Sequence, residues 1–478
     1  MNVMRHNPPK QRQTTLRLTG KQAEGLRQHL YPGDGCEAPA LALCGRRHDA
    51  THDVLCIHEI MPIPYDECLV RTPNRVSWPT DRLPALLRRA EDEGLGLVKI
   101  HSHPSGWDAF SAYDDASDRD VLGAAYSWLD DNAPHASVIM LPDGRMIGRV
   151  MRPDGAFIPI DLIAVAGDDL LFYHARSGEE EQAVPDHALR HAQAFGAGTI
   201  RRLARLSVGV IGCSGTGSPV VEMLGRLGVG ELVLVDPQRV ERLNLNRILN
   251  TGQEDTGHYK VEVLADAVTR MGTGTRVVAI SDTLTQPDVI KRVALCDIVF
   301  GCMDSIEGRD VLNRLAAHYL IPYFDIGVGL VADGRGGVGE VNGAVHYLQP
   351  DGSSLLSRGV YSAEQVAAEA MRRLDPEAYK HLRQEKYIQG VEEDTPAVVS
   401  VNVQLAALTI NEFLARLHPY RLDPNACFAW HQVSLSAGLY QHGSEGNPCV
   451  ALAQVVGRGD AHPLLGLPYL SQKAEVLA

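Results

Sequence analysis

From Leu206 to Asp236 the chain reads LSVGVIGCSGTGSPVVEMLGRLGVGELVLVD. Its two ends are short apolar runs of strand character, and the segment between them combines a glycine-rich turn with apolar residues at helical spacing. This order predicts a strand, a tight turn, a helix that begins near Pro219, and a second strand. The turn brings three glycines to the start of the helix, Gly212, Gly215 and Gly217. Backbone amides at such a helix start can bind phosphate groups.

The same alternation continues toward the C-terminus. Further strands are expected at 276–280, 297–304 and 323–327, and further helices at 259–271, from Glu307, and at 398–417. Strands that alternate with helices of this length predict a parallel, doubly wound sheet with helices on both faces. The helix at 398–417 is interrupted by polar residues, so we expect it to pack against this sheet or a second subunit rather than cross a membrane.

The first part of the chain has a different pattern. Strands are expected at 41–47, 52–63 and 96–101, helices at 83–94 and 116–131, and a hairpin over 136–151. These elements predict a mixed α/β domain. The polar stretch SGEEEQAVPD predicts a linker. We therefore expect a first domain at 1–176, a linker at 177–186, a Rossmann-like domain at 187–430 and a C-terminal extension of unknown role at 431–478.

Composition narrows the class of protein. The 478 residues carry a formal net charge of -14, which argues against nucleic acid as a partner. The nine cysteines are scattered and form no CxxC pair, so we expect reduced thiols rather than a disulfide framework. No run reaches the roughly 18 apolar residues of a membrane-spanning helix. We expect a cytoplasmic protein without a membrane partner.

A candidate metal site follows the strand at 96–101, where the chain reads HSHPSGWDAFSAYDD. His101 and His103 stand two residues apart on a strand and therefore point to the same face. Asp114 precedes a helical segment and can return as a third ligand. Two histidines and one carboxylate leave the fourth position of Zn²⁺ open for water, the arrangement of catalytic zinc. Ser111 is the candidate oxyanion partner.

The string H-S-H-P, six residues, S-x-x-D resembles the JAMM (JAB/MPN) metallopeptidase family over roughly residues 15–165. The resemblance implies a JAB/MPN-like fold and cleavage of peptide or isopeptide bonds after ubiquitin-like proteins. The family's catalytic glutamate, which activates zinc-bound water, best matches Glu37 in GDGCEAPALALCGRR, although Ala40 replaces a usual glycine. Glu59 and Glu67 are the alternative candidates.

In the second domain, Asp236 ends the strand after the glycine-rich turn and suits a carboxylate that binds ribose hydroxyls. That pair alone favours an NAD-dependent dehydrogenase. Four later residues favour nucleotidyl transfer instead, Asn244, Arg247, Lys260 and Asp304. Cations gathered near phosphates stabilise transferring phosphorus, and a carboxylate can hold magnesium.

The order G-x-x-G-x-G, D, N-x-x-R, K, D resembles the ThiF/MoeB family of adenylating enzymes over about residues 187–420. The resemblance implies an adenylation fold in which ATP is bound by Gly212, Gly215, Gly217, Asp236, Asn244, Arg247 and Lys260. It also implies that Asp304 binds Mg²⁺. Arg190, in RHAQAFG, would reach the triphosphate across a homodimer interface.

This sequence departs from those families at its cysteines. MoeB-like members usually carry two CxxC pairs, and thioester-forming members carry a cysteine on the crossover segment, which here corresponds to Tyr387–Val398 and has none. Cys427 and Cys449 are the candidate nucleophiles, but an incidental thiol is the favoured interpretation of both. Packing explains Cys213 and Cys302.

Together the motifs predict a bifunctional enzyme. One domain would release or process a ubiquitin-like protein through zinc-dependent peptidase activity, and the other would adenylate that protein's C-terminal glycine with ATP. A conjugating enzyme and a role in antiviral defence follow from the resemblance to fused proteins of bacterial conjugation operons. The alternatives are an activating enzyme for a sulfur-carrier protein, a Rossmann oxidoreductase, and a non-enzymatic scaffold.

Overall fold

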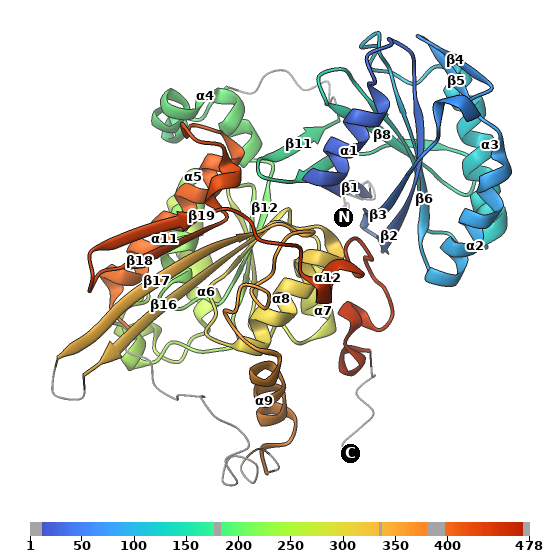
Figure 1. Cartoon of the computed structure of the whole chain (residues 1–478). Helices are drawn as coiled ribbons and strands as arrows, with labels where there is room; N and C mark the ends of the chain where they lie inside the picture. The colour runs from blue at the N-terminus through green and yellow to red at the C-terminus, as the bar shows by residue number, and fades with distance from the viewer. Residues whose placement is uncertain (1–11, 176–182, 334–336, 378, 380–396, 472–478) are drawn as a thin grey trace, which may run out of the picture. The chain divides into compact units, whose positions relative to one another are not determined.

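The computed structural model describes residues 12–175, 183–333, 337–377, 379 and 397–471, so residues 177–182 of the expected linker lie outside it. The chain folds into two compact units (Figure 1). Of the described residues, the first unit contains 12–175 together with His318–Leu320 and Val455–Gly466, and the second contains the others.

The first unit is built on a mixed nine-stranded sheet in the order β11-β10-β1-β3-β2-β6-β7-β8-β9. Its strands are β1 (Gln13–Thr19), β2 (Pro39–His48), β3 (His52–Pro62), β6 (Gly96–Ser102), β7 (His135–Met140), β8 (Met146–Met151), β9 (Phe157–Pro159), β10 (Leu162–Ala166) and β11 (Leu170–His174). A separate two-stranded ribbon consists of β4 (Val70–Thr72) and β5 (Arg75–Ser77). Its helices are α1 (Gly20–Leu30), α2 (Leu83–Glu93) and α3 (Ala112–Leu129).

Alternation along β2 explains why helices cover both faces of this sheet. Ala40 and Ala42 pack with α1 on one face, whereas Leu41 and Leu43 pack with α2 and α3 on the other. Successive side chains of a strand point to opposite faces, so an uninterrupted apolar strand must be buried on both. The elements expected in this region are present, but β1, α1 and the strands from β9 onward were not predicted, because their short runs carry weak periodicity.

The second unit contains an eight-stranded sheet in the order β14-β13-β12-β15-β16-β17-β18-β19. Its strands are β12 (Ser207–Ile211), β13 (Glu231–Val235), β14 (Arg276–Ile280), β15 (Ile298–Gly301), β16 (Tyr323–Ala332), β17 (Val338–Leu348), β18 (Trp430–Ser434) and β19 (Leu439–Gly443). Its helices are α4 (Leu189–Leu203), α5 (Gly217–Leu227), α6 (Lys260–Met271), α7 (Pro287–Val293), α8 (Ile306–Tyr319), α9 (Ala363–Leu374), α11 (Val399–Leu417) and α12 (Val450–Ala453).

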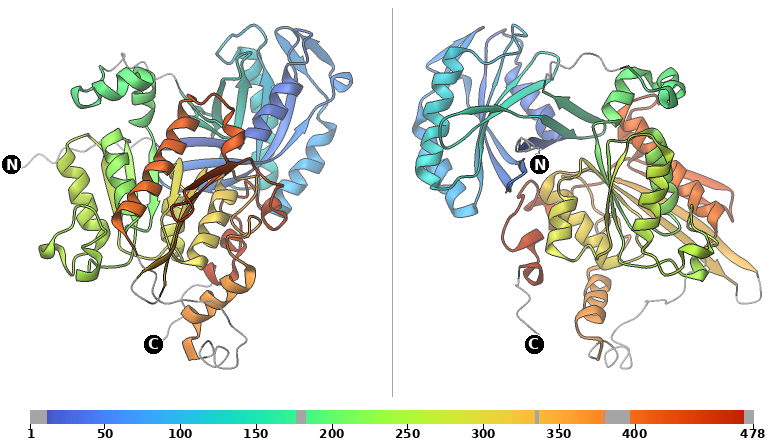
Figure 2. Two further views of the ribbon diagram at one scale, coloured as in Figure 1. Left: turned by 60° about the vertical axis from the view of Figure 1, so that its left-hand side comes forward. Right: turned by 180° about the vertical axis from the view of Figure 1, so that it is seen from behind.

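The first five strands of this sheet are parallel, as expected, but β17, β18 and β19 are antiparallel. Antiparallel neighbours need only a short connection, so no helix signals them in the sequence. The helices α5, α6 and α11 lie on one face and α7 and α8 on the other (Figures 1 and 2). The strand order reverses between β12 and β15, the point where doubly wound sheets bind ligands.

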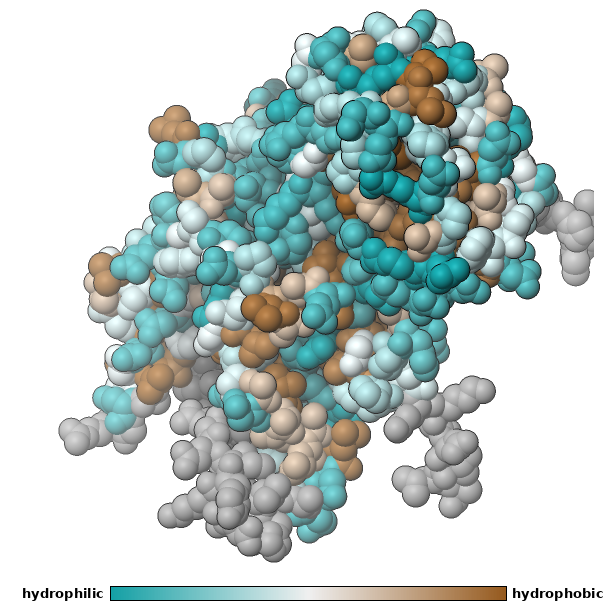
Figure 3. All heavy atoms as spheres, turned by 45° about the vertical axis from the view of Figure 1, so that its right-hand side comes forward, coloured by the Kyte–Doolittle hydropathy of each residue, from teal (hydrophilic) through white to brown (hydrophobic). Residues whose placement is uncertain are grey.

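The expected extension at 431–478 contributes most of β18 and all of β19 to the second sheet, whereas its later segment Val455–Gly466 belongs to the first unit. There Arg458 pairs with Glu93 of α2 at 2.7 Å. The face of the molecule in Figure 3 is mostly hydrophilic, with separate apolar patches. Among the described residues, no helix has the length and apolar character needed to cross a membrane.

Candidate functional site

His101, His103 and Asp114 converge in the first unit. The Nε2 atoms of the two histidines lie 3.1 Å apart, and the carboxylate of Asp114 lies 3.2 Å from His101 Nε2 and 3.7 Å from His103 Nε2. All three side chains are buried. The last residues of β6 supply His101, the following turn supplies His103, and the first turn of α3 supplies Asp114.

This cluster has the donor set and the supporting contacts of a metal centre. His103 Nδ1 lies 2.7 Å from the backbone oxygen of Trp107, a partner that orients the ring and leaves Nε2 facing the other ligands. Burial lowers the pKa of His101, which favours the neutral, metal-binding form. Three donor atoms within 4.8 Å of one another fit a single divalent cation.

Ser111 is the N-cap of α3. Its hydroxyl donates to Asp114 at 2.7 Å and accepts from the Asp114 backbone amide at 3.2 Å, a reciprocal capping arrangement. Burial raises the pKa of Asp114, but its contacts with His101 and Ser111 outweigh burial and hold it well below its usual range. Ser111 therefore fixes the carboxylate of Asp114 in its ionised form, and its oxyanion role stays a prediction.

Glu37 precedes β2, whose first residue, Pro39, is paired with His101 of β6. Burial, and then the negative charge of Asp114, raise the pKa of Glu37 to about 7, while Lys99 opposes the shift. A carboxyl with such a pKa can exchange a proton near neutral pH.

The alternative glutamates have other partners. The carboxylate of Glu59 pairs with Arg89 at 2.7 Å, and that of Glu67 pairs with Arg82. These surface ion pairs suit structural roles, so Glu37 is the better candidate for acid–base chemistry.

The glycine-rich turn of the second unit lies at the strand-order reversal, between β12 and α5. Gly212 has a φ of 90°, and a Cβ there would lie 2.5 Å from the backbone oxygen of Cys302, which follows β15. A Cβ on Gly217 would lie 1.9 Å from the Gly212 oxygen. Only glycine allows the backbone to pack this closely at the start of α5, where amides can receive a phosphate.

The carboxylate of Asp236 closes this turn from β13. It accepts from the amide of Cys213 at 2.7 Å and from the amide of Gln238 at 2.8 Å, and it is buried. Lys260, at the start of α6, is also buried and donates to the side chain of Gln238 at 2.6 Å. The predicted ribose carboxylate and the predicted cation are thus linked through Gln238, a residue outside the sequence motifs.

Asn244 and Arg247 occupy the turn after β13. The side-chain oxygen of Asn244 accepts from the amide of Glu241 at 3.1 Å, and Arg247 donates to the Leu243 oxygen at 2.7 Å. A Cβ added to Gly215 would lie 3.5 Å from Arg247 Cδ, so this arginine is beside the glycine-rich turn.

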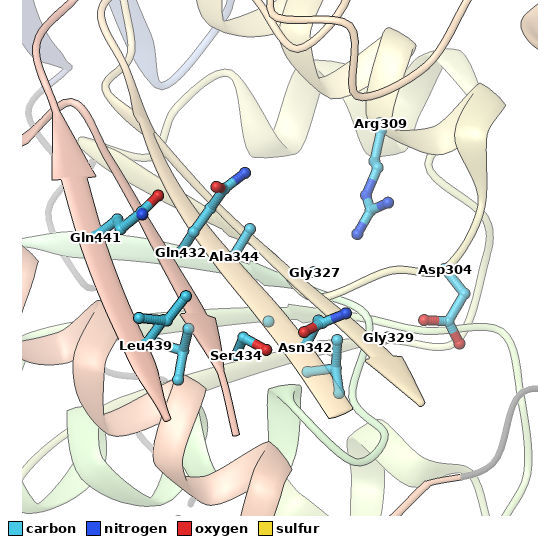
Figure 4. A pocket seen from close by; sticks show the side chains of 13 residues that line it. Asp304, Arg309, Gly327, Gly329, Asn342, Ala344, Gln432, Ser434, Leu439 and Gln441 are labelled. Atoms are coloured by element: carbon cyan, nitrogen blue, oxygen red, sulfur yellow. The ribbon is translucent and has the colours of Figure 1, made fainter. Parts of the chain in front are cut away.

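Asp304 follows β15 and lines a pocket of about 730 Å³, a size that suits a small ligand or a peptide segment. Asp304 and Arg309 stand on one side of this pocket, and the amides of Asn342, Gln432 and Gln441 line the rest (Figure 4). The floor is formed by β16 to β19, of which the sequence predicted only the beginning of β16.

Two side chains near this site could have been found from the sequence. Arg309 stands five residues after Asp304 on the first turn of α8, and its guanidinium contacts buried Asp325 at 3.3 Å. Asn402 is a polar interruption of the apolar helix α11, and a Cβ on Gly215 would lie 2.3 Å from its Nδ2. The available signals were the closeness of Arg309 to Asp304 in the chain and the polar Asn402 in an otherwise apolar helix.

Residues 188–423 match the profile of the ThiF family. They form a ThiF-family domain. The match spans the five parallel strands, the glycine-rich turn and every nucleotide-site residue discussed above.

Curated relatives resemble parts of this domain. Ubiquitin-like modifier-activating enzyme 5 of Culex quinquefasciatus is 27% identical over 31% of this chain and 38% of its own. Adenylyltransferase and sulfurtransferase MOCS3 of Mus musculus is 35% identical over 23% of this chain and 24% of its own length. SAMP-activating enzyme E1 of Haloferax volcanii is 31% identical over 32% of this chain and 52% of its own length. The chain thus spans between about a quarter and a half of these relatives. The solved structure of E. coli MccB with ATP aligns with 56% of this chain and 74% of its own, with 18% identity and a TM-score of 0.43.

Arg190 of the ThiF-family domain is exposed near the start of α4, where it contacts Gln193 at 3.2 Å. Burial raises the pKa of Cys213 and Cys302, which therefore stay protonated and serve packing, as expected. Cys449 is buried at the start of α12 and Cys427 is half-buried. Residues 387–396 of the crossover segment lie outside the described residues.

The raised pKa of Glu37 predicts a pH-dependent stability. Its pKa of about 7 exceeds the ordinary value of 4.5, so the folded chain binds this proton more tightly than the unfolded chain. The resulting stabilisation is complete below about pH 4.5 and is lost as pH rises through 7. We expect the Tm of the metal-free protein to fall by a few degrees between pH 5 and pH 8 for this reason, and Glu37→Gln to reduce that fall. An unchanged pH dependence in Glu37→Gln would contradict the assignment.

Proposed function

We propose that the ThiF-family domain adenylates the C-terminal carboxylate of a ubiquitin-like or sulfur-carrier protein with ATP and Mg²⁺. The observation that carries the proposal is the position of Asp304 beside both a phosphate-type turn and a peptide-sized pocket. This geometry and the family match favour nucleotidyl transfer over hydride transfer and over a scaffold without activity.

Each polar group of the site would have a separate task. The amides at the start of α5 would bind phosphate oxygens, and Asp236 would bind the ribose hydroxyls. Lys260 and Arg247 would offset the charge that develops on the phosphate during attack by the carboxylate. Asp304 would hold the magnesium ion, which neutralises phosphate charge and helps pyrophosphate leave.

Two glycines support the pocket as the place for a protein tail. Gly327 and Gly329 stand two residues apart on β16, and neither has a positive φ. A Cβ added to them would find its nearest neighbour at 3.6 Å and 3.9 Å, so nothing within the described chain requires glycine there. Gly343 is different, because a Cβ would lie 2.7 Å from Leu405. A strand glycine without internal cause fits the close approach of another backbone.

The first unit supports a second activity, zinc-dependent cleavage of a peptide or isopeptide bond. The supporting observation is the buried convergence of His101, His103 and Asp114. Zinc held by these three residues would supply Lewis acidity, which polarises a bond under attack and makes water easier to deprotonate. Glu37 would take a proton from that water at its carboxylate and pass it to the leaving amine. Ser111 would stabilise the developing negative charge.

The two activities form a chemical sequence, since peptidase action yields the carboxylate that adenylation consumes. The same peptidase chemistry would also remove the ubiquitin-like protein from modified proteins. In that case a conjugating enzyme would be a further partner, and antiviral defence would be the biological role. Sulfur transfer is the alternative fate of the adenylate. In a homodimer, Arg190 would bind the triphosphate of the partner's nucleotide. The nine free thiols agree with a reducing cytoplasm.

Replacement of the proposed magnesium ligand tests adenylation. Asp304→Ala should lower ATP–pyrophosphate exchange, driven by a ubiquitin-like protein that ends in glycine, by about 100-fold or more. Asp282→Ala is the matched control, because Asp282 also follows a parallel strand, β14, but does not line the pocket. Exchange that survives in Asp304→Ala would refute the site.

Enlargement of a pocket glycine tests the tail site. Gly329→Val should raise the KM for a peptide that ends in Gly-Gly by at least about tenfold, a loss of roughly 1.4 kcal/mol of binding, while ATP binding is retained. The control is Gly339→Val, another exposed strand glycine outside the pocket lining. Equal KM values in the two variants would exclude the pocket as the tail site.

Removal of the histidines tests the metal centre. The purified chain should contain about one zinc, and His101→Ala with His103→Ala should lose it and the peptidase activity. Metal analysis by mass spectrometry measures this, with His29→Ala as a control at a half-buried histidine elsewhere in the first unit. Unchanged zinc in the double variant would show that the ligands are wrong.

A further inference from the structure

We propose that Arg149 is a positioning residue for the metal centre, which it serves by holding the N-terminal half of α3 in place. The inference rests on the proposed zinc site and assigns a residue beyond its ligands. Asp114 reaches the histidines from the first turn of α3, so any contact that fixes this turn also fixes a ligand.

The guanidinium group of Arg149 forms ion pairs with two carboxylates of that helix. Its Nε and Nη2 lie 3.0 Å and 2.7 Å from the same oxygen of Asp118, and its Nη1 lies 2.5 Å from Asp115. Asp118 is one helical turn beyond Asp114, so both carboxylates face the sheet. The side chains of Arg149 and Asp118 are 9% and 0% exposed, so little water competes for these contacts.

A second cation holds Asp118 from the strand that carries His101. Lys99 Nζ lies 2.7 Å from the other carboxylate oxygen of Asp118. Lys99 pairs with Ser137 of β7, and Ser137 pairs with Arg149 of β8, so the two cations flank one position of the sheet. Two positive and two negative side chains, with Asp115 included, balance the charge beneath the metal ligands.

Arg149 also packs against the loop that joins His103 to α3. Its guanidinium carbon lies 3.9 Å from the ring centre of Phe110 and 3.8 Å from that of Phe157. The ring of Phe110 in turn contacts His101 edge-on, with the ring centres 6.5 Å apart. Arg149 therefore touches both segments that bring Asp114 back to the histidines. Lysine could replace its charge but not its planar, two-sided contact.

The test is the zinc affinity of the purified full chain, measured by competition with a chromogenic chelator. Loss of an outer-shell partner of a metal ligand typically weakens metal binding by about 10–100-fold, and because Arg149 acts on Asp114 only indirectly, through α3, Arg149→Lys should weaken zinc binding by about 10-fold, the lower end of that range. Co²⁺ bound in place of zinc should show altered absorption bands if Asp114 is displaced. Asp115→Asn removes only the ion pair between Arg149 and a partly exposed carboxylate, so it should weaken zinc binding less. This variant provides the test if Arg149→Lys does not fold.

Arg46→Lys is the matched control. Arg46 is also 9% exposed and also forms a two-pronged pair, with Asp131 just beyond the opposite end of α3. Its replacement should lower the Tm without changing the zinc affinity or the Co²⁺ spectrum. If Arg149→Lys and Asp115→Asn bind zinc as tightly as the unaltered chain, Arg149 is only structural and the inference is wrong. If the unaltered chain binds no zinc, the proposed metal centre fails as well.

Discussion

The arrangement of the second unit depends on a steric constraint at its glycine-rich turn. The backbone after β12 turns within contact distance of the backbone after β15, and a single added carbon at Gly212 or Gly217 would overlap a main-chain oxygen. This contact places the start of α5 at the reversal of strand order, where amides, Asp236 and Asp304 can meet one ligand. The buried carboxylate of Asp236 then fixes the turn by accepting one of its amides. The rest of the proposed nucleotide site is arranged around a loop that tolerates no side chain at Gly212 or Gly217.

The candidate metal centre of the first unit depends on ionisable side chains that are buried. Burial alone would protonate a carboxyl or discharge a histidine. Asp114 stays ionised because Ser111 and His101 contact it, whereas Glu37 has fewer compensating contacts and titrates near neutral pH. Two carboxyls in one neighbourhood are thus held in different states, one suited to bind a cation and the other suited to move a proton.

Sequence reasoning located the candidate residues where the chemistry is local. The two-residue spacing of His101, on β6, and His103, in the turn directly after it, brings these side chains together, as does the spacing of Ser111 and Asp114 at a helix start. It failed where partners come from distant segments. The strands β17 to β19 were missed because antiparallel neighbours leave no helix-length signal, and the pocket beside Asp304 was missed with them. Gln238 carried no signal in the sequence until folding brought it between Asp236 and Lys260.

The sequence by itself determined two α/β units, a glycine-rich turn that only an unsubstituted backbone can form, and a donor set fit for a metal, since each follows from residues close in the chain. Tertiary structure alone decided that Arg149 meets Asp118, that Gly327 and Gly329 face an open pocket, and that Val455–Gly466 belongs to the first unit. The reason is physical. Side-chain direction follows from local periodicity, but the neighbour that a side chain meets depends on strand order and helix packing across the whole unit.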